Sequence, residues 1–114
     1  MLLSEKDKQV YDQIYGQMIA YLKDRGDYDP AVDNGFVDMA VRALIRIRKL
    51  DDRMDVVDVE ETPAFVDAIC KLYTVFDKAI EELAANRKER LKTKKQKTVE
   101  NELREAMREL MGLK

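Results

Sequence analysis

Seven cationic side chains crowd into residues 87–97 (RKERLKTKKQK), with one acidic residue among them. Cations at this density neutralise nucleic-acid phosphates and release condensed counterions, so binding should be strong at low salt and weak at high salt. The block contains no aromatic side chain that could stack on bases. The alternative is a solvated linker that keeps the chain soluble. The residues predicted to contact the DNA backbone are Arg87, Lys88, Arg90, Lys92, Lys94, Lys95 and Lys97.

Catalytic chemistry has little support in the other side chains. The chain has no His, which removes the commonest general base and the commonest neutral metal ligand. Its one Cys, Cys70, has no His or second Cys to activate it, and we expect a buried, inert thiol. The sequence also lacks a Gly-rich phosphate loop and a nucleophile elbow. We therefore predict a protein that is not an enzyme and that holds no cofactor.

Two further charged groups lie near the middle of the chain. The six acidic residues between positions 51 and 61 offer oxygen ligands, but they lack EF-hand spacing and a central Gly, so no metal site is expected. A basic stripe recurs at intervals of four, three and four residues, at Arg42, Arg46, Lys49 and Arg53. This stripe could follow a DNA backbone, but salt bridges to the acidic neighbours are the favoured interpretation.

The net charge of −2 conceals an uneven distribution. Residues 1–86 carry 11 basic and 18 acidic side chains, residues 87–97 carry 7 and 1, and residues 98–114 carry 3 and 4. A local basic block can bind anions even on an acidic protein. No apolar run approaches the ~20 residues needed to span a bilayer, and the first residues turn charged at once, so we expect a cytoplasmic protein without a membrane segment.

The elements that must position these groups are predicted to be helices. Ser4 is a good N-cap, and apolar residues recur every three or four positions from Val10 to Leu22 until Gly26 provides a stop. Asp27–Pro30 reads as a turn. A second helix is predicted over 33–54, apolar nearly all round in its first half, which is typical of a central helix in a bundle.

The second half of the chain is predicted to hold two more helices. After an acidic connector at 55–61, Thr62 and Pro63 form a strong start signal, and a heptad seam runs from Phe65 to Leu83. A last helix is predicted from Thr98. Its apolar stripe is separated from the seam by the basic block, so we expect it to mediate self-assembly. The predicted oligomerisation residues are Val99, Leu103, Ala106, Met107, Leu110 and Leu113.

These elements predict an all-α helical bundle with long antiparallel helices and a C-terminal oligomerisation helix. The organisation expected is a helical core over residues 1–86, a basic linker or helix extension over 87–97, and an assembly helix over 98–114. A chain of 114 residues fits one domain with a modest core.

The strings YLKDRGDYDP and VDNGFVDMAVRALIRIRKLDDRM, together with the close NELREAMRELMGLK, resemble bacteriophage terminase small subunits. The resemblance covers most of the chain at the level of pattern. It implies a non-enzymatic ring that binds viral double-stranded DNA and presents it to a large terminase subunit, which carries the ATPase and nuclease and is regulated by the small one. The chain is shorter than many members, which favours backbone contacts over sequence reading. The alternative is a small helical interaction adaptor that does not bind nucleic acid.

Overall fold

The computed structural model of the chain describes residues 4–25, 28–56, 58–87 and 94–111. Within those ranges it has no strand and contains α1 (Glu5–Arg25), α2 (Pro30–Met54), the short 3-10 helix η1 (Val59–Glu61), α3 (Thr62–Ala85) and α5 (Gln96–Leu110). The expected all-α helical bundle is confirmed. None of these helices is long and apolar enough to cross a membrane.

Short-range hydrogen bonds explain where the first two helices begin. The Ser4 hydroxyl accepts from the Asp7 backbone N–H at 3.2 Å, which confirms the predicted cap of α1. The Asp29 carboxylate accepts from the Ala31 N–H at 3.1 Å, and Pro30 takes the first helical position. Helix α2 therefore begins three residues before the predicted Asp33. Gly26, the predicted stop of α1, lies outside the described residues.

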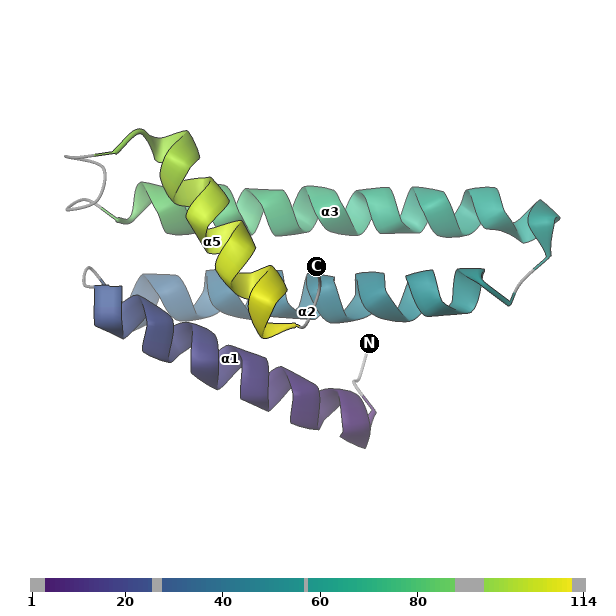
Figure 1. Ribbon diagram of the computed structural model, residues 1–114, viewed down its shortest axis with the longest axis horizontal. Helices are drawn as coiled ribbons and strands as arrows, with labels where there is room; N and C mark the ends of the chain where they lie inside the picture. The colour runs from purple at the N-terminus through teal and green to yellow at the C-terminus, as the bar shows by residue number, and fades with distance from the viewer. Residues whose placement is uncertain (1–3, 26–27, 57, 88–93, 112–114) are drawn as a thin grey trace.

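Helices α2 and α3 run antiparallel and form a hairpin, joined through the acidic connector that holds η1 (Figure 1). Helices α1 and α5 pack against one part of this hairpin (Figure 1). We call that part, residues 30–47 of α2 and 76–85 of α3, the inner half. The outer half consists of residues 48–54 and 62–75. Every buried residue of α2 and α3 lies in the inner half.

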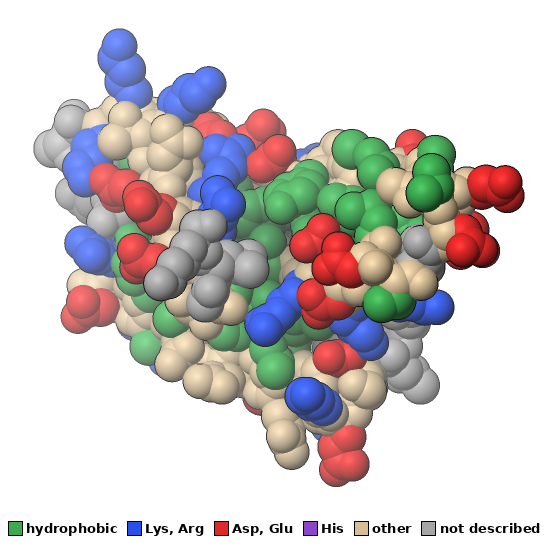
Figure 2. Space-filling view, turned by 45° about the vertical axis from the view of Figure 1, so that its right-hand side comes forward, with side chains coloured by type: hydrophobic (Ala, Val, Ile, Leu, Met, Phe, Trp, Pro, Cys, Tyr) green, Lys and Arg blue, Asp and Glu red, His purple; other side chains and the backbone are tan. Residues whose placement is uncertain are grey.

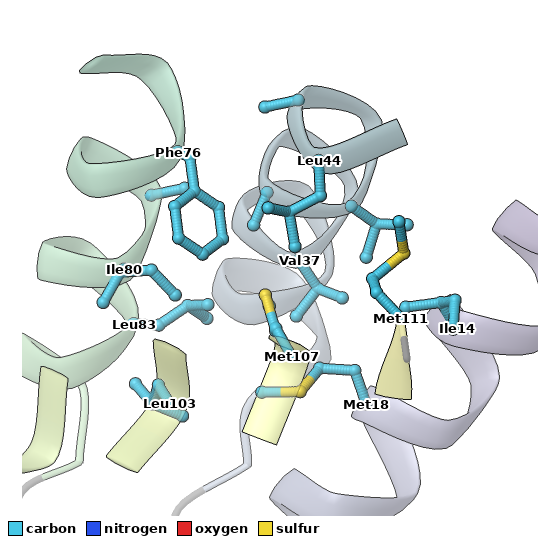
Figure 3. Close-up of a cluster of buried hydrophobic side chains, with 14 of the residues drawn as sticks. Ile14, Met18, Val37, Leu44, Phe76, Ile80, Leu83, Leu103, Met107 and Met111 are labelled. Atoms are coloured by element: carbon cyan, nitrogen blue, oxygen red, sulfur yellow. The ribbon is translucent and has the colours of Figure 1, made fainter. Parts of the chain in front are cut away.

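The core is one cluster to which all four α-helices contribute (Figure 3). Side chains of α3 and α2 face those of α5 and α1 across its centre (Figure 3). Its fully covered large side chains include Met18, Leu22, Val37, Leu44, Ile80, Leu83, Leu103 and Met107. Three methionine side chains, from α1 and α5, fill the region where these helices meet, as flexible thioethers do in irregular spaces.

The self-assembly role predicted for the last helix is wrong for its central residues. Val99, Leu103 and Met107 are each 0% exposed inside the chain's own core, so they present no free face to another copy. Ala106 and Leu110 are half-buried, and Leu113 lies outside the described residues. The physical reason is that α3 ends at Ala85 rather than continuing through the basic block. The connection that follows lets α5 turn back onto α3 and α1 (Figure 1).

This packing gives a stability test of α5. Leu103→Ala removes apolar contacts from a fully buried site and should lower the free energy of unfolding by about 2–5 kcal/mol. The measurement is urea unfolding followed by circular dichroism. Leu110→Ala, the same change at a half-buried position of the same helix, should cost clearly less. Equal and negligible costs at both positions would show that α5 does not dock on the core.

Candidate functional site

The basic end of the molecule is assembled from two helices distant in sequence. The last turn of α1 and the start of α5 lie at the same end (Figure 1). Arg25 and Lys94 line one shallow hollow there, together with the acidic residues Glu102, Glu105 and Glu109. All the described cations of these two turns are exposed: Lys23, Arg25, Lys94, Lys95 and Lys97. Lys94 also pairs with Glu102 of α5. Of the predicted DNA contacts, Lys88, Arg90 and Lys92 lie outside the described residues.

Arg87 is the exception, and its predicted contact with DNA is wrong. Its side chain is 0% exposed and forms an ion pair with Asp33, which is equally buried near the start of α2. The Asp33 carboxylate also accepts from the Asp29 N–H at 2.9 Å and lies 3.5 Å from the Asn86 amide nitrogen. Arg87 follows the C-cap of α3, and the chain leaves the helix there with the Arg87 side chain turned inward to Asp33 rather than to solvent.

This ion pair fixes the basic end to the core. It joins the start of α2 to the residue that follows the C-cap of α3, where the basic block begins. The Nε and Nη1 atoms of Arg87 have no hydrogen-bond partner among the described residues. A buried guanidinium with two unsatisfied donors depends strongly on its one carboxylate partner. The pair therefore sets where the basic segment leaves the helical core.

A second polar cluster ties α1 to α2. The Tyr11 hydroxyl donates to Asp38, whose carboxylate also accepts from Arg42 Nε at 2.8 Å. The Tyr11 and Tyr15 rings stack at 5.5 Å between centroids, and both are half-buried, as a packing role requires. Burial, followed by the hydrogen bond to Asp38, raises the pKa of Tyr11 well above its ordinary value. The cluster holds two helices together and has no free nucleophile or base.

The basic stripe on α2 is partly neutralised, as predicted, but by other acids than those expected. Arg42 pairs with Asp38, and Lys49 pairs with Asp7 of α1 at 2.6 Å. The hydrogen bond from Lys49, followed by that from Ser4, lowers the pKa of Asp7. One pair lies within a single turn of α2 and the other joins α2 to α1, and neither involves an acidic residue of the 51–61 cluster. The stripe is therefore mainly part of the α1–α2 contact.

The expectation of a buried thiol is also wrong, since Cys70 is exposed on α3. Cys70 directly follows Ile69 of the heptad seam, and in the outer half even the seam residues are only half-buried. Within the described ranges, no group of three or more His, Cys, Asp or Glu side chains is placed to hold a metal ion.

An uncovered apolar face on the outer half is a feature that the sequence interpretation missed. Val66 and Tyr73 are 45% and 44% exposed, although they continue the stripe of buried Ile80. Figure 2 shows hydrophobic side chains gathered on the right half of the view, with acidic side chains at its outer edge. The sequence does contain an indication of this face. The apolar heptad pattern of α3 is longer than that of α5, so α5 cannot cover all of it.

Comparison of the chain with protein-family models, with curated proteins and with solved structures finds no match. Two described surfaces therefore carry any functional argument. One is the basic end on α1 and α5, and the other is the apolar face of the outer half with its acidic edge.

The buried ion pair yields a stability prediction. Asp33→Ala leaves Arg87 buried and unpaired, and should lower the free energy of unfolding by about 3–5 kcal/mol in chemical denaturation. Replacing both partners by apolar residues, Asp33→Leu with Arg87→Met, should recover most of that loss. The matched surface pair, Asp67 with Lys71 at 3.1 Å, should contribute at most about 1 kcal/mol when broken. Similar costs for both pairs would refute the anchoring role of Arg87.

The Tyr11 cluster gives a pH prediction. The neutral hydroxyl donates to Asp38, so the raised pKa stabilises the fold at pH values below the ordinary tyrosine pKa of 10.0. That contribution should disappear as the pH rises above 10 toward the raised folded-state pKa. Absorbance titration of the tyrosines should show a late-ionising fraction that Tyr11→Phe reduces, while Tyr15, whose pKa burial also raises, still contributes to it. If the amplitude that Tyr11→Phe removes comes from the fraction that ionises near pH 10, the Tyr11–Asp38 hydrogen bond is absent in solution.

Proposed function

We propose that this chain is a non-enzymatic viral DNA-packaging component, similar to a small terminase subunit, that binds double-stranded DNA through its basic end. The observation that carries the proposal is that Lys23, Arg25, Lys94, Lys95 and Lys97 are all exposed and belong to two chain segments at the same end of the molecule (Figure 1). Arg25 and Lys94 line one hollow there, which Glu102, Glu105 and Glu109 also line. Five exposed cations at one end of the molecule could neutralise several phosphates of a DNA backbone.

The start of α5 adds a second favourable feature for phosphate. Lys95 is the N-cap residue of α5 and makes no side-chain capping hydrogen bond. The first-turn N–H groups and the helix dipole therefore favour an anion at that terminus. Backbone N–H donors and lysine ammonium groups recognise phosphate without reading base edges, so the expected binding is largely independent of sequence.

The charge on the opposite end of the molecule favours one orientation on DNA. Residues 51–67 carry seven acidic side chains and one basic side chain, and this segment joins α2 to α3 at the outer end of the hairpin. DNA repels that end and attracts the end formed by α1 and α5. The protein should therefore approach DNA with the hairpin pointing away from the duplex.

The remaining parts of the proposal rest on the resemblance. They are assembly into a ring, contact with a large terminase subunit, and regulation of its ATPase and nuclease by a chain with no catalytic chemistry of its own. A host-cell cytoplasm is the setting that this role implies.

A helical adaptor that binds no nucleic acid is the second candidate. The observation that favours it is the uncovered apolar face of the outer half, which includes Val66 and Tyr73. A mobility assay with duplex DNA at low salt separates the two candidates, because an adaptor of this kind leaves the DNA unshifted.

The DNA proposal predicts a charge-dependent loss of affinity. The triple variant Lys94→Gln, Lys95→Gln, Lys97→Gln should weaken binding to unrelated duplexes alike. It should also flatten the dependence of log K on log salt by about 0.9 for each DNA phosphate that the variant no longer neutralises. Fluorescence anisotropy over a series of salt concentrations measures both quantities.

A matched control carries the same change of charge elsewhere. Lys8, Lys71 and Lys78 are exposed lysines away from the basic end, and replacing all three by Gln should leave the salt slope close to that of the parent. Equal weakening by both triple variants would indicate a response to net charge alone, and the basic end would not be the DNA site.

A further inference from the structure

The apolar stripe of α3 continues past the point where α5 stops covering it. Two heptad rows run along this helix, Ile69–Phe76–Leu83 and Val66–Tyr73–Ile80. Phe76, Leu83 and Ile80 are at most 3% exposed, whereas Val66 and Tyr73 are 45% and 44% exposed. The same rows are therefore buried in the inner half and open in the outer half.

The length of α5 explains where the cover ends. Helix α3 has 24 residues and α5 has 15, which correspond to about 36 and 22 Å at ~1.5 Å per residue. Helix α5 also crosses the hairpin at an angle, so it covers even less of the length of α3 (Figure 1). From Thr62 to Val75, all of them described, no residue of α3 is buried.

A groove between the two hairpin helices begins where α5 ends. It has a volume of about 290 Å³, and its floor is apolar. The floor residues are Leu44, Ile47, Ile69 and Tyr73, and the α2 rim carries Arg48, Asp51 and Asp52. In Figure 2 the hydrophobic side chains of this region form a continuous surface with charged side chains around it. The groove continues the face on which α5 is seated.

Charge changes sign along the outer half. Near its boundary with the inner half, the groove rim carries the exposed Arg48 of α2. The neighbouring Lys49 is turned toward α1, where it pairs with Asp7. Toward the connector, residues 51–67 hold seven acidic side chains and one basic side chain. A partner surface whose acidic and basic groups follow in the reverse order would be complementary in charge.

We infer that the outer half of the hairpin is a docking surface for a second copy of this chain, with the two hairpins antiparallel. In this arrangement the α2–α3 groove of each copy receives the exposed stripe of the other, and the two outer halves close a four-helix bundle. The acidic connector of each copy then lies toward Arg48 on the groove rim of its partner. A two-fold contact of this kind is self-complementary and joins two chains, so the ring of the proposed function would use a further interface between such pairs.

A second copy satisfies what the surface requires. The occupant must supply helices with apolar residues at heptad spacing, as α5 does in the inner half, and the outer half itself carries that pattern. It must also place bases against acids and acids against bases, which two outer halves achieve only when they run antiparallel. A parallel pairing would set the two acidic connectors against one another.

The test is the mass of the full chain in solution. Because no DNA is present, the result is independent of the DNA proposal. Sedimentation equilibrium from about 1 to about 100 µM brackets moderate and weak association. The expected species is twice the 13.3 kDa of one chain. Val66→Glu puts a charge into the groove contact and should raise the dissociation constant at least about tenfold. Tyr73→Lys, at a similarly exposed site, is the second variant should Val66→Glu perturb the helix.

Val32→Glu is the matched control, because Val32 is 39% exposed but lies in the inner half of the hairpin. It should leave the dissociation constant unchanged, and circular dichroism should show the same helix content for all variants. A single-chain mass at every concentration overturns the inference. So does an assembled mass that Val66→Glu leaves unchanged, or that Val32→Glu disrupts equally.

Charge reversal tests the antiparallel orientation. Asp55→Lys with Asp58→Lys reverses two charges of the acidic connector, which the antiparallel pair places toward Arg48 of the partner. This double variant should weaken association, and adding Arg48→Glu in the same chain should restore it. A parallel pair sets each connector against its own copy, so the Asp55 and Asp58 change would not weaken it. Association unchanged by the double variant, or not regained by the triple variant, overturns the antiparallel pairing.

Discussion

The apolar stripe of the α2–α3 hairpin is longer than the helices that this chain folds onto it, and the remaining features follow from that mismatch. Helices α1 and α5 complete the inner half, where Ile80 and Leu83 are fully buried. Beyond α5, Val66 and Tyr73 repeat the pattern without a cover. Burial of such residues is the main favourable term in helix packing. Covering the outer half with further helices would therefore lower the free energy.

The buried pair of Asp33 and Arg87 separates two surfaces with different chemistry. It joins α2 to α3 at the end of the hairpin away from the acidic connector. Packing of α5 on α3 and α1 places the start of α5 at that same end (Figure 1). The proposed DNA surface and the proposed contact between hairpins therefore lie at different ends of the molecule.

The sequence predicted the helices well, because caps and periodicity are local. Ser4 and the heptad spacing of α3 predicted elements that the structure contains, and Pro30 fits the first position of α2. The tertiary contacts of these helices were harder to predict. The apolar face of α5 was evident, but its spacing does not say whether it docks on its own chain or on another. Arg87 was grouped with its cationic neighbours by composition, whereas its burial depends on a carboxylate 54 residues away in the sequence, Asp33, which no local pattern indicates.

Backbone hydrogen exchange of the full chain at low and high protein concentration tests the central claim most directly, because it reports each half of the hairpin separately. The account predicts that amides of residues 76–85 and of α5 are protected at both concentrations. Those of residues 62–75 should gain protection only when the protein is concentrated. Free exchange throughout α5, or protection of residues 62–75 that is equally strong at high dilution, would contradict it.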